Sequence, residues 1–168
     1  MCGSDHGDEP AEYALEFKGL DWRTLHPEFL SYHSAALSFF TDAAFAYFLP
    51  AFMMADVLGE AGNADLVFQL THGLYEEPPF DLTSLNPEAL QASGLAAEDL
   101  EWLQESVQET SIIDWHAYAL QRFAGFRLQE RQAIVRYLAY RAARGWDFEA
   151  QKIHEALDSY WMPPPDKA

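Results

Sequence analysis

Hydrophobic and polar positions follow helical spacing over most of this chain. In the segment Ala96–Gln108, for example, Leu100, Leu103 and Val107 recur three or four residues apart, so they would share one face of a helix. Nowhere do four or more residues alternate cleanly between apolar and polar, which is the pattern typical of a strand with one buried face. The pattern therefore predicts an all-α protein, a single irregular bundle of about seven or eight helices.

Start and stop signals give the bounds of these helices. Thr41 has the hydroxyl of an N-cap, Asn63 and Ser111 are expected to cap later helices, and Gly145 marks a helix end. The predicted helices are Pro27–Phe40, Asp42–Glu60, Ala64–Thr71, Asn86–Gln91, Ala96–Gln108, Ile112–Phe123, Leu128–Arg144 and Asp147–Trp161.

The segment Asp42–Glu60 is expected to be the central helix. Its apolar residues lie on most of its sides, as in a helix covered by neighbours: Phe45, Phe48, Leu49, Phe52, Met53 and Leu58. Pro50 in its middle removes one backbone donor and clashes one turn back, so we expect a kink there.

The length of 168 residues indicates one domain. Residues 1–10 are expected to form a flexible N-terminal tail, residues 11–162 the helical domain, and residues 163–168 a Pro-rich C-terminal tail. The most apolar stretch, between Asp42 and Asp56, is shorter than the roughly 20 residues that span a bilayer. With no signal peptide in sight and a single cysteine, Cys2, we expect a soluble cytoplasmic protein.

Charge is distributed unevenly along the chain. The net charge is −17, and the stretch Thr24–Gln121 holds 15 acidic residues and no Lys or Arg. The segment Arg122–Lys152 reverses this, with seven basic residues against three acidic ones. The basic C-terminal third can therefore pair with the acidic middle. The negative field that remains would repel nucleic acid and anionic membranes and attract basic partners.

Motifs of catalysis and metal binding are missing from the sequence. The nine glycines are scattered singly, with no phosphate-binding loop, and the six histidines do not show metal-ligand spacing. We therefore expect no enzymatic activity, no cofactor and no metal.

One predicted helix carries a candidate binding site. On the helix Ala96–Gln108 and its extension to residue 109, four acidic residues fall within about 80° of one another at 100° per residue. They lie opposite the leucines, and Trp102 projects beside them. Like charges at this spacing weaken a helix, whereas a tryptophan among acids is typical of an interface anchor. The candidate partner-binding residues are Glu98, Glu101, Trp102, Glu105 and Glu109; the alternative is that Trp102 packs under a neighbouring helix.

Three segments together suggest a family. Trp22, Leu37-Ser-Phe-Phe-Thr41 and Tyr47-Phe-Leu-Pro-Ala51 resemble an uncharacterised bacterial family, a domain of unknown function, and the C-terminal Ala156-Leu-Asp-Ser-Tyr-Trp161 is also similar. The segment Leu74–Ile112 is not covered. The resemblance implies a bacterial origin and a helical fold, and it brings no activity or site residues.

Three functions remain open from the sequence. The first is a non-enzymatic acidic module that binds a basic protein, of which an immunity-type inhibitor of a toxin or nuclease would be one example. The second is a small-molecule or metal-binding pocket among the aromatic helices, to which His33, Tyr47 or His116 would contribute. The third is a homodimer in which the basic region Arg127–Arg144 meets an acidic face of its mate.

Overall fold

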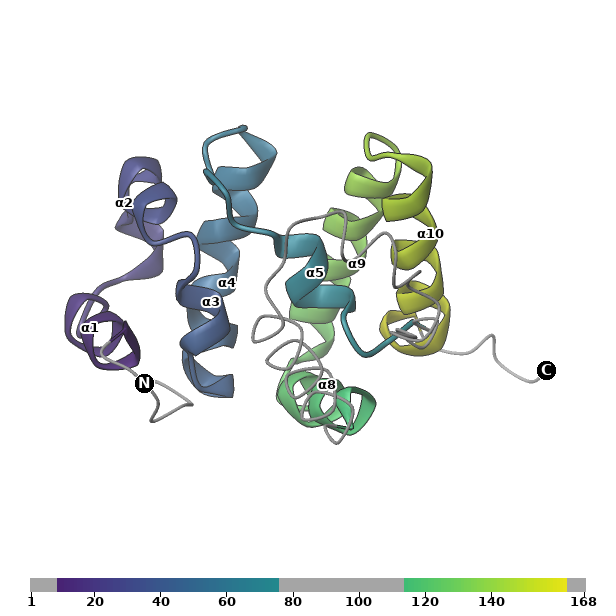
Figure 1. The fold of residues 1–168 in the computed structure, drawn as a ribbon, viewed down its shortest axis with the longest axis horizontal. Coiled ribbons are helices and arrows are strands. Elements are labelled where there is room, and N and C mark those ends of the chain that lie inside the picture. Colours follow the sequence, from purple (N-terminus) through teal and green to yellow (C-terminus); the bar gives the residue numbers. More distant parts are fainter. Residues whose placement is uncertain (1–8, 76–113, 163–168) are drawn as a thin grey trace, which may run out of the picture.

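The computed structural model describes residues 9–75 and 114–162, and these residues are helical without a strand (Figure 1). The all-α prediction is confirmed. The elements in chain order are α1 (Glu9–Glu16), η1 (Trp22–Thr24), α2 (Pro27–Tyr32), α3 (Ala36–Phe39), α4 (Asp42–Val57), α5 (Leu66–Thr71), α8 (Trp115–Phe123), α9 (Leu128–Ala142), α10 (Asp147–Ala156) and the π-helical turn η3 (Leu157–Trp161). None of the helices described is long and apolar enough to cross a membrane.

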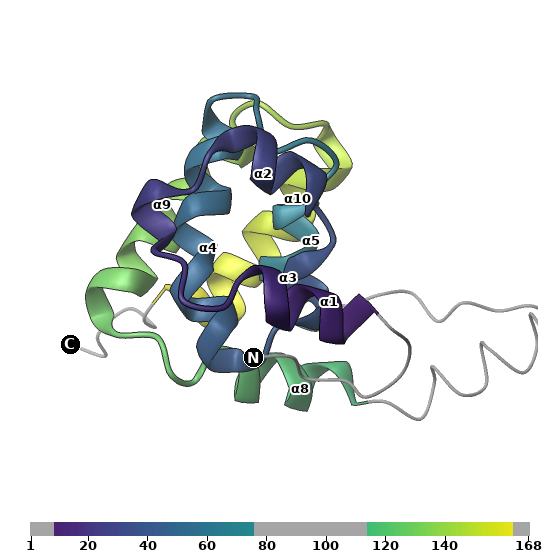
Figure 2. The same cartoon turned by 90° about the vertical axis from the view of Figure 1, so that its left-hand side faces the viewer.

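The helices follow one another along the long axis of the molecule. Figure 1 shows α1 and α2 at one end, α3 and α4 next, then α5, α8 and α9, and α10 at the other end. Figure 2 looks along this axis from the α1 end. Helices α4 and α9 are the two longest helices described and run in the same direction. Phe45 faces Phe126 near their starts, with ring centroids 6.3 Å apart, and Asp56 meets Tyr137 near their ends.

Helix α4 is the centre of the core, as its sequence predicts. Phe45, Phe48, Leu49 and Phe52 are buried along it, and the helix continues through Pro50. Phe17, from the segment after α1, packs its ring 5.0 Å from Phe48. Each of these side chains contributes roughly 1.5–3 kcal/mol by leaving water. The side chains on α4 thus join α1 to the rest of the bundle.

The predicted single helix Pro27–Phe40 is wrong. Helix α2 ends at Tyr32 and α3 begins at Ala36, with a turn between them in which the His33 N–H donates to the Phe29 carbonyl oxygen (3.0 Å). The turn leaves His33 only 5 % exposed, with its ring 4.3 Å from that of Phe29. Local helical spacing does not reveal such a break, because its benefit comes from packing against α1.

Two other bounds differ from the predictions. Helix α1 begins at Glu9, before the predicted start of the domain at residue 11. Helix α5 is capped by Asp65, whose carboxylate accepts from the Phe68 N–H at 2.9 Å, and not by Asn63. A carboxylate directly before the first turn also interacts favourably with the helix dipole.

The start of α4 agrees with the prediction, whereas α8 begins at Trp115, later than the predicted start at Ile112. Thr41 caps α4 as expected, with its hydroxyl accepting from the Ala44 N–H (3.3 Å). Asp114 caps α8 through the Ala117 N–H (2.9 Å), while the predicted cap Ser111 lies outside the described residues. The predicted helix Asp147–Trp161 corresponds to α10 followed by η3.

Candidate functional site

The acidic site predicted from the sequence lies outside the described residues. This applies to Glu98, Glu101, Trp102, Glu105 and Glu109, and to the helix Ala96–Gln108 that would carry them. The docking surface therefore stays a prediction.

The histidines proposed for a ligand pocket are engaged within the fold. His33 is buried, with Nδ1 3.2 Å from the Glu16 carboxylate. His116 uses Nδ1 in a 2.9 Å hydrogen bond with the Gly73 carbonyl oxygen. In residues 9–75 and 114–162, no three His, Cys, Asp or Glu side chains gather as metal ligands. Of the three proposed pocket residues, Tyr47 lines a sizeable hollow among the described residues.

That hollow is an apolar groove between α4 and α9, with a volume of about 790 Å³. Its size falls within the range of small-molecule sites, which are mostly apolar with a few polar groups. Side chains three to four residues apart on each helix form its two walls, and η1 adds to its rim. Its lining residues are Trp22, Arg23, Ala46, Tyr47, Leu49, Pro50, Met53, Met54, Val57, Leu58, Phe126, Glu130, Ala133, Ile134, Arg136, Tyr137 and Tyr140.

Several large apolar side chains on the α4 wall are exposed. Met54 is 60 % exposed and Leu58 66 %, while Tyr47 and Val57 are close to half exposed. Single exposed apolar residues are ordinary, whereas a group of them around one hollow is typical of binding surfaces. The sequence pattern groups Leu58 with the covered residues of the predicted helix Asp42–Glu60, and this is wrong: Leu58 follows the last residue of α4 and is exposed. The pattern alone therefore misses this surface.

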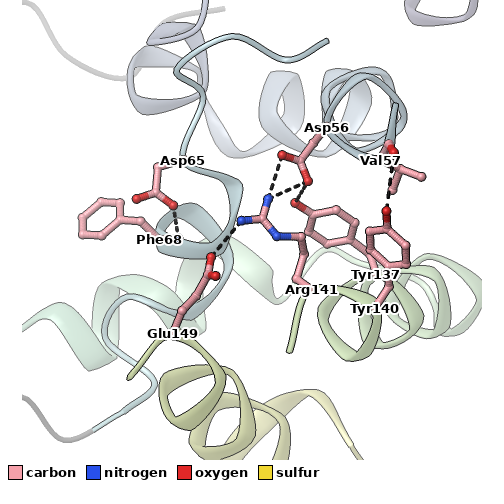
Figure 3. A network of polar contacts seen from close by, with 8 residues as sticks. All are labelled: Asp56, Val57, Asp65, Phe68, Tyr137, Tyr140, Arg141 and Glu149. Carbon is pink, nitrogen blue, oxygen red and sulfur yellow. Dashed lines mark hydrogen bonds and ion pairs between the residues drawn. The ribbon is translucent and has the colours of Figure 1, made fainter. Parts of the chain in front are cut away.

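A polar network joins α4 to α9 at one end of the groove (Figure 3). Arg141 Nη1 lies 2.7 Å from both carboxylate oxygens of Asp56, and the Tyr137 hydroxyl donates to Asp56 at 2.7 Å. Arg141 Nη2 also donates to Glu149 of α10 at 2.8 Å. One guanidinium therefore connects the three helices α4, α9 and α10.

The network changes the titration of its members. Burial, followed by the hydrogen bond to Asp56, raises the pKa of the Tyr137 hydroxyl. Burial acts to lower the pKa of Arg141, but its hydrogen bonds to Asp56 and the nearby negative charges outweigh this, and the net effect raises the pKa. Tyr137 thus stays neutral and Arg141 stays charged over the ordinary pH range.

The polar groups around the groove differ in whether they have hydrogen-bond or ion-pair partners in the protein. Arg23 pairs with Asp21 at 3.3 Å, and the Glu130 carboxylate accepts from the Arg127 N–H at 2.7 Å at the start of α9. The Tyr140 hydroxyl lies 3.5 Å from the Val57 carbonyl oxygen. Arg136 is exposed and makes no hydrogen bond, ion pair or ring contact within the described residues of the chain.

No family model, curated protein or solved structure matches the chain. The resemblance carried by Trp22, Leu37–Thr41 and Tyr47–Ala51 therefore stays a prediction.

A second arginine, Arg122 of α8, is buried beneath the α3–α4 junction. It donates to the Leu37 carbonyl oxygen (2.6 Å) and to the Phe40 carbonyl oxygen (3.3 Å), and its guanidinium lies 4.1 Å from the Phe45 ring centroid. Asp42 is 3.7 Å away. Burial lowers the pKa of Arg122, partly offset by Tyr118 and Asp42.

These contacts confirm that the basic C-terminal third pairs with the acidic middle. Arg122 reaches Asp42 and Arg141 reaches Asp56, across more than 75 residues of sequence. Arg131 is also engaged within the protein, where its guanidinium donates to the Tyr160 carbonyl oxygen at 2.6 Å. Fewer arginines are thus left for the homodimer contact predicted for Arg127–Arg144.

Proposed function

We propose that this chain is a binding protein, and that the groove between α4 and α9 holds a small, mostly apolar molecule. The observation that carries the proposal is the groove itself, about 790 Å³ in volume with exposed Met54 and Leu58 on its wall. Covering such side chains with a ligand gives a free-energy gain of about 25 cal/mol per Å² of apolar surface buried.

Contacts between the two walls of the groove support this proposal. One end is held by the Asp56–Tyr137–Arg141 contacts and the other by Phe45 and Phe126. A site whose walls are fixed before binding loses little conformational entropy when the ligand enters.

A fluorescent apolar probe, N-phenyl-1-naphthylamine, tests the proposal. The Ala133→Trp change places a large ring in the groove, because Ala133 is exposed and lines it. We expect the probe to bind the unmodified protein and to bind this variant at least about tenfold more weakly, equivalent to about 1.4 kcal/mol.

Ala139→Trp is the matched control. Ala139 is also exposed on α9 and does not line the groove, so the same substitution should leave probe binding unchanged. Absence of probe binding, or equal binding by both variants, would contradict the proposal.

The charge distribution favours a second candidate, the capture of a basic protein. The stretch Thr24–Gln121 has no basic residue, and among its described carboxylates Asp42 and Asp56 pair with arginines from the C-terminal third. The other acidic residues of a chain with net charge −17 would steer a basic partner, such as the target of an immunity-type inhibitor.

A low-salt pull-down with the purified protein tests this second candidate. Trp102→Ala, and Glu101→Gln combined with Glu105→Gln, should reduce capture of a basic partner. Glu12→Gln combined with Glu28→Gln, both exposed on α1 and α2, removes the same charge elsewhere and should not. Equal capture by all variants would reject the predicted docking site.

A further inference from the structure

We infer that the groove selects molecules with a carboxylate on an apolar tail, and that Arg136 binds the carboxylate. This inference rests on the proposed function, because it names the chemical class of the ligand in the same groove. The polar groups that line the groove differ in whether a ligand could use them.

Most polar groups around the groove already have partners. The Tyr137 hydroxyl donates to Asp56 at 2.7 Å, so a ligand would have to compete with a partly buried carboxylate for it. Arg23 is paired with Asp21 at 3.3 Å. The Tyr137 contact joins α9 to α4, whereas Arg23 makes its ion pair locally at η1, with its guanidinium 4.9 Å from the Trp22 ring centroid. A ligand that used either group would replace a contact within the protein.

Glu130 is also committed to the fold. Its carboxylate accepts the Arg127 N–H at 2.7 Å and so caps the start of α9. An acid in the first turn of a helix is further stabilised by the helix dipole. A ligand with a cationic head would have to draw this carboxylate away from the cap, which makes a positively charged ligand the poorer match.

Arg136 differs from all of these. It lies on α9 at the rim, is exposed, and has no polar or ring partner among the residues described. Its guanidinium offers donors in a planar fork that matches the two oxygens of a carboxylate. A tail packed against Met53, Met54 and Ile134 would leave its carboxylate at the rim, within the wall to which Arg136 belongs.

The acidity of the whole chain sharpens this assignment. A net charge of −17 repels anions at long range, although salt screens this repulsion beyond about 10 Å. An anionic ligand would therefore depend on a short-range contact with a cation that is not already neutralised. Among the described residues of the groove wall, Arg136 meets that condition.

Three molecules with one tail and different heads test the inference: decanoate, decanol and decyltrimethylammonium. Their affinities are measured below their micelle concentrations by displacement of the naphthylamine probe. We expect decanoate to bind about tenfold more tightly than decanol, and the ammonium compound to bind most weakly.

Variants of Arg136 assign the effect to one side chain. Arg136→Gln should remove the preference for decanoate over decanol while leaving decanol affinity unchanged. Arg136→Lys should retain part of the preference for decanoate. Lys18→Gln, which removes one exposed positive charge away from the groove, is the matched control and should keep the preference. Arg136 also borders a smaller hollow beside Leu128 and Met162, so each titration is repeated with Ala133→Trp, which obstructs the larger groove alone.

The outcomes separate the inference from the function on which it rests. Equal binding of decanoate and decanol, or a preference that survives Arg136→Gln or Ala133→Trp, would overturn the inference and leave an apolar groove. Tighter binding of the ammonium compound would overturn it in favour of Glu130. Failure of the probe and of all three molecules to bind would overturn the proposed function as well.

Discussion

At the scale of single residues, two arginines make hydrogen bonds and ion pairs that their sequence positions do not predict. Arg122 is only 6 % exposed and donates to two backbone carbonyl oxygens, whereas Arg141 joins Asp56 to Glu149. A buried charge is costly unless it is paired and hydrogen-bonded, and both arginines satisfy that requirement. Arg136, on the same helix as Arg141, is left available for binding.

Tyr137→Phe is expected to lower stability at neutral pH by about 1 kcal/mol, because it removes the hydrogen bond to Asp56. The raised pKa of Tyr137 also predicts a pH effect. The neutral hydroxyl is favoured in the folded state, so its contribution is complete below the unfolded-state pKa of about 10 and is lost as pH rises beyond it.

Urea unfolding at pH 7, 9 and 10.5 measures both effects. Tyr137→Phe should lose stability less steeply above pH 9 than the unmodified protein does. Tyr32→Phe, at a tyrosine that is 83 % exposed, should leave both quantities unchanged. A parallel pH dependence in Tyr137→Phe and the unmodified protein would contradict the assignment.

At the scale of elements, the contact between the end of α5 and the start of α8 depends on a glycine. Gly73 has φ of +79°, and a Cβ atom there would collide with the backbone carbonyl of Trp115. The Gly73 carbonyl oxygen is also held by His116 of α8. Helix packing at this point therefore requires both a left-handed residue and the absence of a side chain.

Gly73→Ala compared with Gly59→Ala separates these two requirements. Gly59 has φ of +77° and open space where a Cβ would lie, so its substitution should cost only about 1 kcal/mol of backbone strain. Gly73→Ala should cost at least about 2 kcal/mol more, because α8 has to move. Chemical denaturation gives both values, and equal losses would show that α8 accommodates the methyl group freely.

At the scale of the whole molecule, the fold pairs two arginines of the C-terminal third with carboxylates of the acidic middle. Arg122–Asp42 and Arg141–Asp56 link α8 and α9 to the two ends of α4. The chain nevertheless carries a net charge of −17, and self-repulsion of this kind destabilises a compact state.

Added salt is therefore expected to stabilise the protein. Raising NaCl from about 20 mM to about 200 mM should increase the melting temperature by about 3 °C, since the Debye length falls below the spacing of many surface charges. Calorimetry at pH 7 measures this, with an equal osmolality of sucrose as the uncharged control. A melting temperature that is constant or falls with salt would show that the internal pairs dominate the electrostatics.

The sequence by itself determined the class of the fold and much of its helical content. Thr41 marks the start of α4 and the aromatic residues of Asp42–Val57 predict its burial, because capping and helical periodicity act between near neighbours. The charge imbalance also predicted that basic and acidic segments would pair. These features depend on composition and local spacing, which the sequence states directly.

Only the tertiary structure decided where helices break and where a ligand would bind. The burial of His33 beside Glu16 and the pairing of Arg141 with Asp56 depend on residues brought together from distant segments. The groove arises for the same reason, because α4 and α9 are separated by about 70 residues and each contributes one wall. The periodicity of one helix does not specify which face of another helix it will pack against. The packing of α4 against α9 also leaves the Arg136 guanidinium without a protein partner among the described residues.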